Sequence, residues 1–281
     1  MEFCFYSGFN QMLQAQGMEE TALWAQAKGF SAVEFLQINA ENWHAGVESP
    51  AEARHVRKVL QNHRLTTACY SVGINLLDGQ PAIKRLKEQA LLAAELGSPY
   101  FHHTLIDSLV LPPDPPSFEE VFDRILEAAN DVALYCQSLG LTCLYEEQGM
   151  YFNGIKNFGR FFSEISKHCS NVGICGDFGN ILFADESPEA FFDAFKTHVK
   201  HVHIKDFAQS PHIDNVPDPE CWLKTKGGVF LKDVALGKGV IPLKACFQHL
   251  RGANYQGIFA LELVDPTVNN SDAMELCKTL F

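Results

Sequence analysis

The sequence predicts an α/β protein, a single-domain closed (β/α)8 barrel, on three observations. Eight short apolar, β-prone runs recur along the chain, and helix-like segments lie between most of them. Eight such units in 281 residues average about 35 residues each, the size of one βα repeat. The first run is not followed by a G-x-G-x-x-G pattern, which disfavours an open dinucleotide-binding sheet.

The predicted strands are runs of β-branched, aromatic and other apolar residues, as buried parallel strands are. In order, they cover residues 3–6, 32–36, 66–71, 100–105, 142–145, 172–175, 199–204 and 258–263. Because strands that alternate with helices form parallel sheets, all eight carboxyl ends are expected at one end of the barrel.

The predicted helices are recognised by their caps and by apolar spacing. They cover residues 18–28, 50–62, 82–96, 118–139, 188–196 and 243–251. Ser49 and Ser187 each precede a proline, which suits an N-cap followed by the first helical position. Ser117 with Glu120 forms a capping-box pattern, and Gly97 marks the end of the third helix.

Two irregular stretches follow strands and are therefore expected at the carboxyl-terminal face of the barrel. One covers residues 107–116 and contains four prolines, and the other covers about 207–239. Trp222 and Phe230 favour an ordered, lid-like insert over a disordered one in the second stretch. No linker is long enough to divide the chain, so residues 1–281 are predicted as one domain.

Composition narrows the class of protein. The formal net charge is -12, with 22 basic against 34 acidic residues, which argues against a nucleic-acid binder because phosphate backbones are held mainly by Lys and Arg. No apolar run is long enough for a membrane span, and no signal peptide is visible. The nine cysteines are scattered without a C-x-x-C pair, which predicts reduced core residues in a cytoplasmic protein.

Side chains that can bind metal stand at the ends of the last four predicted strands. They are Glu146, Asp177, His203 and Glu262, at spacings of 31, 26 and 59 residues, and the last spacing contains the long insert. Alone, each could be a solvated cap or a salt-bridge partner, but burying three acids together without a cation is costly. Carboxylates with one imidazole suit Mn, Mg or Co and also admit Zn.

At this point the sequence resembles the xylose isomerase-like (β/α)8 barrels. This superfamily of sugar isomerases and epimerases also holds the endonuclease IV-type (AP endonuclease 2-type) repair nucleases. The matching stretches are residues 28–34, 140–146, 172–180, 201–206, 236–243 and 255–262. The resemblance implies that Glu146, Asp177, His203 and Glu262 bind one divalent metal ion.

The resemblance also implies proton transfer next to a carbonyl on a small-molecule sugar or polyol. A divalent metal that chelates a carbonyl and the neighbouring hydroxyl acidifies the α-proton. One carboxylate then removes the proton, and a second returns it at the other face or at the neighbouring carbon. Glu146 and Glu262 are the predicted acid/base pair, with Asp177 and His203 as ligands only.

Further polar and aromatic residues are candidates for substrate contact. We select Glu34, His103, Asn180, Lys205 and Trp222, and Trp43 and His44 lie just past the second strand. Only one of His102 and His103 can face the barrel interior, because side chains alternate along a strand. Glu147 is expected to support the site, to face the substrate or to be solvated.

One position departs from the family pattern. Asn180 stands where many relatives carry a substrate-contacting His. An amide can hydrogen-bond a hydroxyl or carbonyl but cannot exchange a proton near neutral pH. A mechanism that needs an acid or base at this position is therefore not expected.

Three other readings stay open. An inosose-type dehydratase fits the same four ligands and differs only in expelling a hydroxyl after removal of the α-proton. A repair nuclease of the same fold needs additional His ligands, but the sequence offers Glu34, Tyr70-Ser71 and Asn180 at those places. A barrel that only binds a sugar is disfavoured because all four ligand positions are filled. A homo-oligomer is compatible with each reading.

Overall fold

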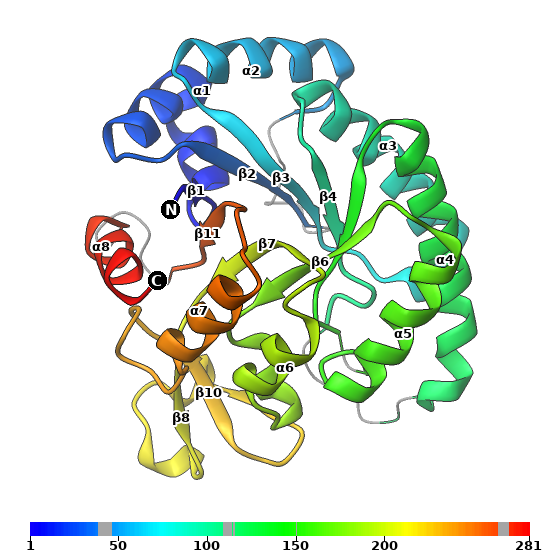
Figure 1. Cartoon of the computed structure of the whole chain (residues 1–281), viewed down its shortest axis with the longest axis vertical. Coiled ribbons are helices and arrows are strands. Elements are labelled where there is room, and N and C mark those ends of the chain that lie inside the picture. Colours follow the sequence, from blue (N-terminus) through cyan, green and yellow to red (C-terminus); the bar gives the residue numbers. More distant parts are fainter. Residues whose placement is uncertain (39–46, 109–113, 115, 150, 264–269) are drawn as a thin grey trace.

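The protein, described here by a computed structural model, is a closed barrel of eight parallel strands with helices outside it (Figure 1). The structure describes residues 1–38, 47–108, 114, 116–149, 151–263 and 270–281. Around the barrel the strand order is β1-β11-β7-β6-β5-β4-β3-β2. The predicted (β/α)8 fold is therefore confirmed.

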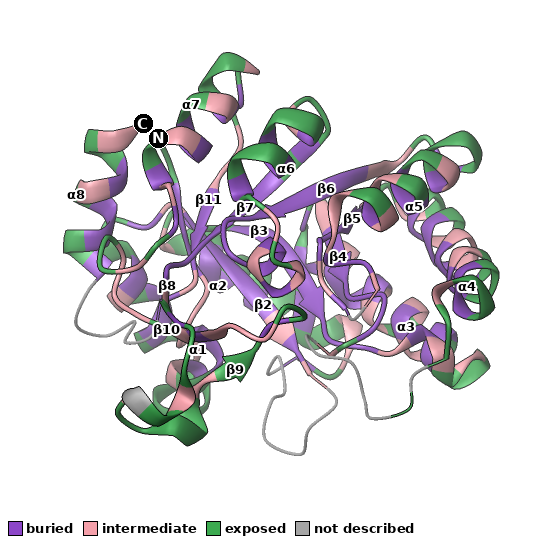
Figure 2. Ribbon diagram, turned by 90° about the horizontal axis from the view of Figure 1, so that it is seen from below, coloured by how far each residue is buried: buried purple, intermediate pink, exposed green. Residues whose placement is uncertain are grey.

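Each of the eight predicted runs overlaps a barrel strand. The strands are β1 (Phe3–Phe5), β2 (Ala32–Gln37), β3 (Thr66–Val72), β4 (Tyr100–His103), β5 (Thr142–Tyr145), β6 (Val172–Asp177), β7 (Val199–Ile204) and β11 (Phe259–Leu261). Only β5 and β7 have the predicted bounds. Pairing of β1 with β11 closes the barrel, and it brings the two ends of the chain close together in both views (Figures 1 and 2).

Eight helices lie in the described residues, two more than predicted. They are α1 (Phe9–Ala27), α2 (Pro50–Asn62), α3 (Gln80–Leu96), α4 (Phe118–Ser138), α5 (Ile155–His168), α6 (Pro188–Phe195), α7 (Leu243–Gly252) and α8 (Asn270–Leu280). The capping boxes of Ser49 and Ser117 are both present. The prediction for α1 began too late, because the helix continues before a kink at Gly17 (φ 83°).

Helix α5 escaped prediction because Gly154 precedes it and provides no side-chain cap. Its apolar spacing was nevertheless visible, since Phe158, Phe161, Phe162 and Ile165 are all buried and recur at helical intervals. The three phenylalanines belong to a layer of large side chains between the strands and the helices. Figure 2 shows the result: buried strands at the centre and helices whose outer faces are exposed.

The barrel interior has a different composition from that layer. Small residues fill its lower part, including Cys4, Ala32, Ala68 and Ala260, which are all nearly inaccessible to solvent. Polar groups replace them toward the carboxyl ends of the strands. This is the end at which (β/α)8 barrels place their active sites.

The insert after β7 is ordered as a small antiparallel sheet with strand order β8-β10-β9. Its strands are β8 (Phe207–Ser210), β9 (Leu223–Lys224) and β10 (Phe230–Asp233). Asp185 holds one side of it by accepting hydrogen bonds from Thr225 and from the backbone of Gly227. The role of this insert as a lid stays a prediction. Of the other irregular stretch, residues 109–113 and 115 lie outside the described residues.

Asp206 anchors the base of the insert. Its buried carboxylate accepts hydrogen bonds from the backbone N–H groups of Phe207, Gly237, Gly239 and Ile241 at 2.8–3.1 Å. A Cβ atom at Gly239 would lie 2.1 Å from Asp206 Oδ1, so this close approach requires glycine. Gly239 thus allows this loop to approach the Asp206 carboxylate closely.

All nine cysteines are free, and eight of them are buried, as predicted for reduced core residues. Cys221 is the exception, because it lies exposed in the insert. None of the described helices combines the length and apolar character that crossing a membrane requires.

Candidate active site

Charged and polar side chains converge inside the carboxyl end of the barrel. Glu146 directly follows β5, Asp177 ends β6, His203 lies on β7 and Glu262 directly follows β11. The structure therefore brings the four predicted ligands together. One nitrogen of His203 and one oxygen each from Asp177 and Glu262 lie within 4.8 Å of one another.

His203 is the centre of this cluster. Its Nδ1 lies 3.1 Å from Glu146 Oε1 and 3.8 Å from Glu262 Oε2, and its Nε2 lies 3.1 Å from Glu34 Oε1. Burial acts to lower the pKa of His203, but Cys175 and the carboxylates of Glu34 and Glu146 raise it well above its ordinary value. Each ring nitrogen of His203 thus faces a carboxylate.

Glu146 is ionised in this environment. Burial acts to raise its pKa, but the hydrogen bond and charge of His203, with smaller contributions from His102 and Lys205, lower the pKa of Glu146 to about 2. The carboxylate is thus in the form that can accept a proton.

Glu34 lies in the middle of β2, below the mouth of the barrel, and is fully buried. It accepts hydrogen bonds from Ser71 Oγ (2.5 Å), His201 Nε2 (2.7 Å) and His203 Nε2 (3.1 Å). Burial acts to raise its pKa, but His203 and His201 outweigh that effect and hold the pKa of Glu34 well below its ordinary value. The substrate contact expected of Glu34 stays a prediction, and its oxygens accept hydrogen bonds from Ser71, His201 and His203.

Lys205 places an ammonium group among the carboxylates. Its Nζ lies 2.9 Å from Glu262 Oε1 and 3.2 Å from both Asp177 Oδ2 and Asn180 Oδ1. Burial acts to lower the pKa of Lys205, but Asp177, Glu262 and Glu146 raise it well above its ordinary value. Lys205 and Asn180 thus lie in the cluster, as the predicted substrate contacts require.

Asp177 is held in place through its other oxygen. Oδ1 accepts the backbone N–H groups of Gly179 and Asn180, both at 2.7 Å. Burial raises the pKa of Asp177 to about 7, against the opposing charge of Lys205. Among the described residues, Oδ2 accepts no hydrogen bond.

The choice between the two histidines of β4 is corrected. His102, rather than His103, faces the interior, where its Nδ1 contacts Ser71 Oγ at 3.0 Å and its Nε2 lies 3.7 Å from Glu146. His103 points the other way, into the aromatic layer, with its ring 5.3 Å from that of Tyr145. The alternation rule allows only one inward residue, but it does not say which one.

Two nearby residues had no clear assignment from sequence. Glu147 is fully buried rather than solvated, and it accepts the backbone N–H of Asp177 at 3.2 Å. Burial and the charges of Asp177 and Glu146 raise the pKa of Glu147 well above its ordinary value.

Tyr6, which directly follows β1, stacks on the ring of His203, with a distance of 4.7 Å between ring centroids and an angle of 20° between ring planes. Its place after a strand was the available signal.

Of the remaining predicted contacts, Trp222 is not brought into the cluster. Trp222 is half-buried in the insert, where its Nε1 donates to the Pro217 carbonyl at 3.0 Å. Trp43 and His44 lie outside the described residues.

The donor set fits a divalent cation. Asp177, His203 and Glu262 offer ligand atoms within 4.8 Å of one another, and Glu146 forms a second such group with His203 and Cys175. Asp177 Oδ2 accepts no hydrogen bond among the described residues and is paired with the Lys205 ammonium at 3.2 Å. Lys205 supplies a positive charge close to the carboxylates. Hard oxygen donors with one nitrogen match Mn, Mg, Co or Zn.

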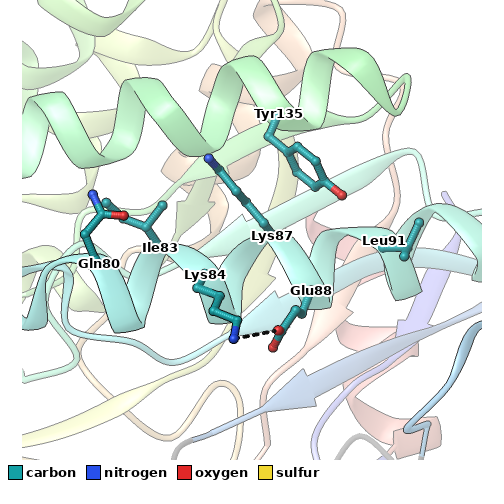
Figure 3. Close-up of a pocket in the computed structure, with 7 residues that line it drawn as sticks. All are labelled: Gln80, Ile83, Lys84, Lys87, Glu88, Leu91 and Tyr135. Atoms are coloured by element: carbon teal, nitrogen blue, oxygen red, sulfur yellow. Dashed lines mark ion pairs between the residues drawn. The ribbon is translucent and has the colours of Figure 1, made fainter.

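A separate groove of about 510 Å³ lies between α3 and α4 on the outside of the molecule (Figure 3). Its Lys84 pairs with Glu88 on the same helix, and Lys87 pairs with Asp131 on α4 at 2.7 Å. It contains none of the clustered residues, so the chemistry is assigned to the barrel end.

The whole arrangement matches one family. The family model described as "Xylose isomerase-like TIM barrel" matches residues 22–280. This chain belongs to the xylose isomerase-like TIM barrel family. Among curated relatives, the inosose dehydratase of Bacillus anthracis is 27% identical over 174 residues, which is 59% of this chain. The match covers 55% of that relative, so the chain spans little more than half the length of the curated relatives it matches.

Solved structures share the fold over nearly the full chain. D-psicose 3-epimerase from Clostridium cellulolyticum H10, with D-tagatose, has a TM-score of 0.75 at 13% identity, covering 100% of this chain and 99% of that one. The IOLI protein with a zinc atom has a TM-score of 0.71 at 14% identity, covering 100% and 96%. A xylose isomerase-like TIM barrel protein from Mycobacterium smegmatis, in complex with magnesium, has a TM-score of 0.69 at 14% identity. The match covers 93% of this chain and 87% of that one. At these identities the likeness shows the fold.

Proposed function

We propose that this protein is a divalent-metal-dependent sugar isomerase or epimerase that transfers a proton next to a carbonyl of a ketose or related polyol. The observation that carries the proposal is the position of Glu146 and Glu262 near one nitrogen of His203, at 3.1 and 3.8 Å. The family and its neighbours named as sugar epimerases support this class of reaction.

The residues divide into two groups in this proposal. Asp177, His203, Glu146 and Glu262 hold the cation, which when bound polarises the substrate carbonyl and stabilises the negative charge that develops. Glu146, ionised beside His203, is the base that takes the α-proton. Glu262, on the strand end beyond His203, is the second carboxylate, through which a proton is returned to the substrate.

Other side chains orient the substrate. Asn180 and Lys205 present an amide and an ammonium group beside the carboxylates, and both can hydrogen-bond a hydroxyl or carbonyl. Tyr6 offers a ring at the edge of the cluster on which a sugar face can pack. Burial of these groups excludes water from the proton that is transferred.

A dehydratase acting on a cyclic polyol such as inosose is the second candidate. Two observations favour it: the curated relatives are named inosose dehydratase, and the ammonium of Lys205 lies 2.9 Å from Glu262. That ammonium could assist departure of a hydroxyl after the α-proton has been removed.

The decisive experiment is a substrate screen with exchange of the α-proton as the readout. Protein stripped with a chelator is reloaded with Mn, Mg, Co or Zn and incubated in D2O with ketohexoses, hydroxypyruvate and inosose. Deuterium incorporation without loss of water supports the isomerase or epimerase, whereas loss of 18 mass units supports the dehydratase. Absence of both from every metal and substrate combination contradicts the proposal.

A further inference from the structure

The hydrogen bonds of Glu34 cross the barrel interior. β2 and β7 are separated by β1 and β11, yet the Glu34 carboxylate bonds both inward histidines of β7. His201 and His203 both point inward because they are two residues apart on one strand. One carboxylate therefore ties two distant strands at the level just below the proposed metal site.

The bond to Glu34 determines which nitrogen of His203 faces the other carboxylates. An imidazole binds a cation through a ring nitrogen without a proton, and the nitrogen that keeps its proton needs an acceptor. Glu34 accepts from Nε2 at 3.1 Å, so Nδ1 is the nitrogen directed at Glu146 and Glu262.

Further hydrogen bonds restrain the orientation of the Glu34 carboxylate. Its second oxygen accepts from His201 at 2.7 Å, and Ser71 donates to the first at 2.5 Å. The imidazole of His203 is also restrained by the ring of Tyr6, which stacks on it at 4.7 Å. The ring and its acceptor thus form a rigid unit.

From this geometry we infer that Glu34 is a positioning residue, which fixes the ring and the tautomer of His203 for the metal and does not contact substrate. His201 and Ser71 restrain Glu34 in turn. The inference rests on the proposed metal site, and it assigns Glu34 a role different from the substrate contact expected from sequence.

Metal affinity tests the inference without relying on turnover. Calorimetric titration with Mn or Co compares the intact protein with Glu34→Gln, which removes the charge at the same length, and Glu34→Asp, which keeps the charge but shortens its reach. We expect binding about 10- to 100-fold weaker in both, with KM unchanged in any remaining turnover. Glu186→Gln is the matched control, since Glu186 lies outside the cluster, where it accepts the backbone N–H of Ile155, and the variant should bind metal normally.

Two other outcomes distinguish failure of this inference from failure of the proposed function. Unchanged metal affinity with a raised KM in Glu34→Gln would overturn the inference and restore a substrate contact. If the intact protein binds no metal at all, the proposed function fails together with it.

If the Glu34 variants do not fold, a measurement on the unaltered chain still tests the inference. Nitrogen NMR of ¹⁵N-histidine-labelled, zinc-loaded protein reports the protonated nitrogen of His203 directly, with His203→Asn used to assign the signal. We expect a proton on Nε2 and the metal on Nδ1. The reverse arrangement overturns the inference.

Discussion

His102 and His103 are consecutive residues of β4 with the same side chain, both nearly inaccessible to solvent, in opposite surroundings. His102 faces the interior, where Ser71 and Glu146 lie close to its ring. His103 faces the layer under the helices, where the rings of Phe101 and Tyr145 surround it. Two consecutive side chains of one strand thus lie in different environments, one in the polar interior and one in the aromatic layer.

The two regions tolerate polar groups for different reasons. The interior carries several charges because they are paired, as Glu34 is with His201 and His203. The aromatic layer has few such partners: His103 donates Nδ1–H to the Thr104 carbonyl, and its Nε2 has no hydrogen-bond partner among the described residues. We therefore expect substitutions inside the barrel to affect activity and those in the layer to affect stability.

The largest effect is expected inside the barrel. Glu146→Gln and Glu262→Gln should each lower kcat/KM by about 10²- to 10⁴-fold, because each removes a proposed acid/base group, while some metal binding remains. The matched control is Glu147→Gln, which still accepts the Asp177 N–H and should stay within about tenfold of the natural chain. Near-normal activity in both first variants would contradict the assignment of the acid/base pair.

The next effect tests the aromatic layer. Phe161 on α5 is fully buried and meets the Tyr145 ring edge-on at 5.0 Å. Phe161→Ala should lower the free energy of unfolding by about 3–5 kcal/mol, because it leaves a cavity. Urea unfolding measures this change. Activity per folded molecule should be unaffected, and a large drop would show that the two regions are not separate.

His103 predicts a pH dependence of stability. Burial, the main cause, lowers the pKa of His103 to about 4, with a small opposing effect of the Thr104 carbonyl, so the folded chain favours the neutral ring. The stabilisation is present above the unfolded pKa of about 6.5 and is lost as pH falls toward 4, by about 3 kcal/mol. The difference in unfolding free energy between the natural chain and His103→Gln should shift by this amount between pH 7 and pH 4. A constant difference would show that the ring is not buried as described.

The smallest effect is expected at the outer groove. Lys84 and Glu88 are exposed and lie 3.9 Å apart on α3. Lys84→Ala should change stability by less than about 0.5 kcal/mol and leave turnover unchanged, since exposed ion pairs contribute little. Thermal unfolding and the exchange assay check both. A clear loss of activity would mean that the chemistry does not belong to the barrel end alone.

Local sequence patterns predicted much of the fold and four residues of the candidate site. Short β-prone runs, serine caps and the βα repeat length predicted a closed barrel, because propensity and periodicity act within a few residues. The ends of the strands likewise indicated Glu146, Asp177, His203 and Glu262, since parallel strands place their carboxyl ends together. Their grouping in space follows from the fold, and their chemical roles stay predictions.

Tertiary structure alone decided which face each side chain meets and what it meets there. Sequence alternation could not choose between His102 and His103, because that choice depends on the register of β4 with its neighbours. Nor could it reveal that Glu34 is bonded to His201 and His203, residues 167 and 169 positions away. Contacts across a barrel interior depend on its closure, so they exist only once all eight strands have paired.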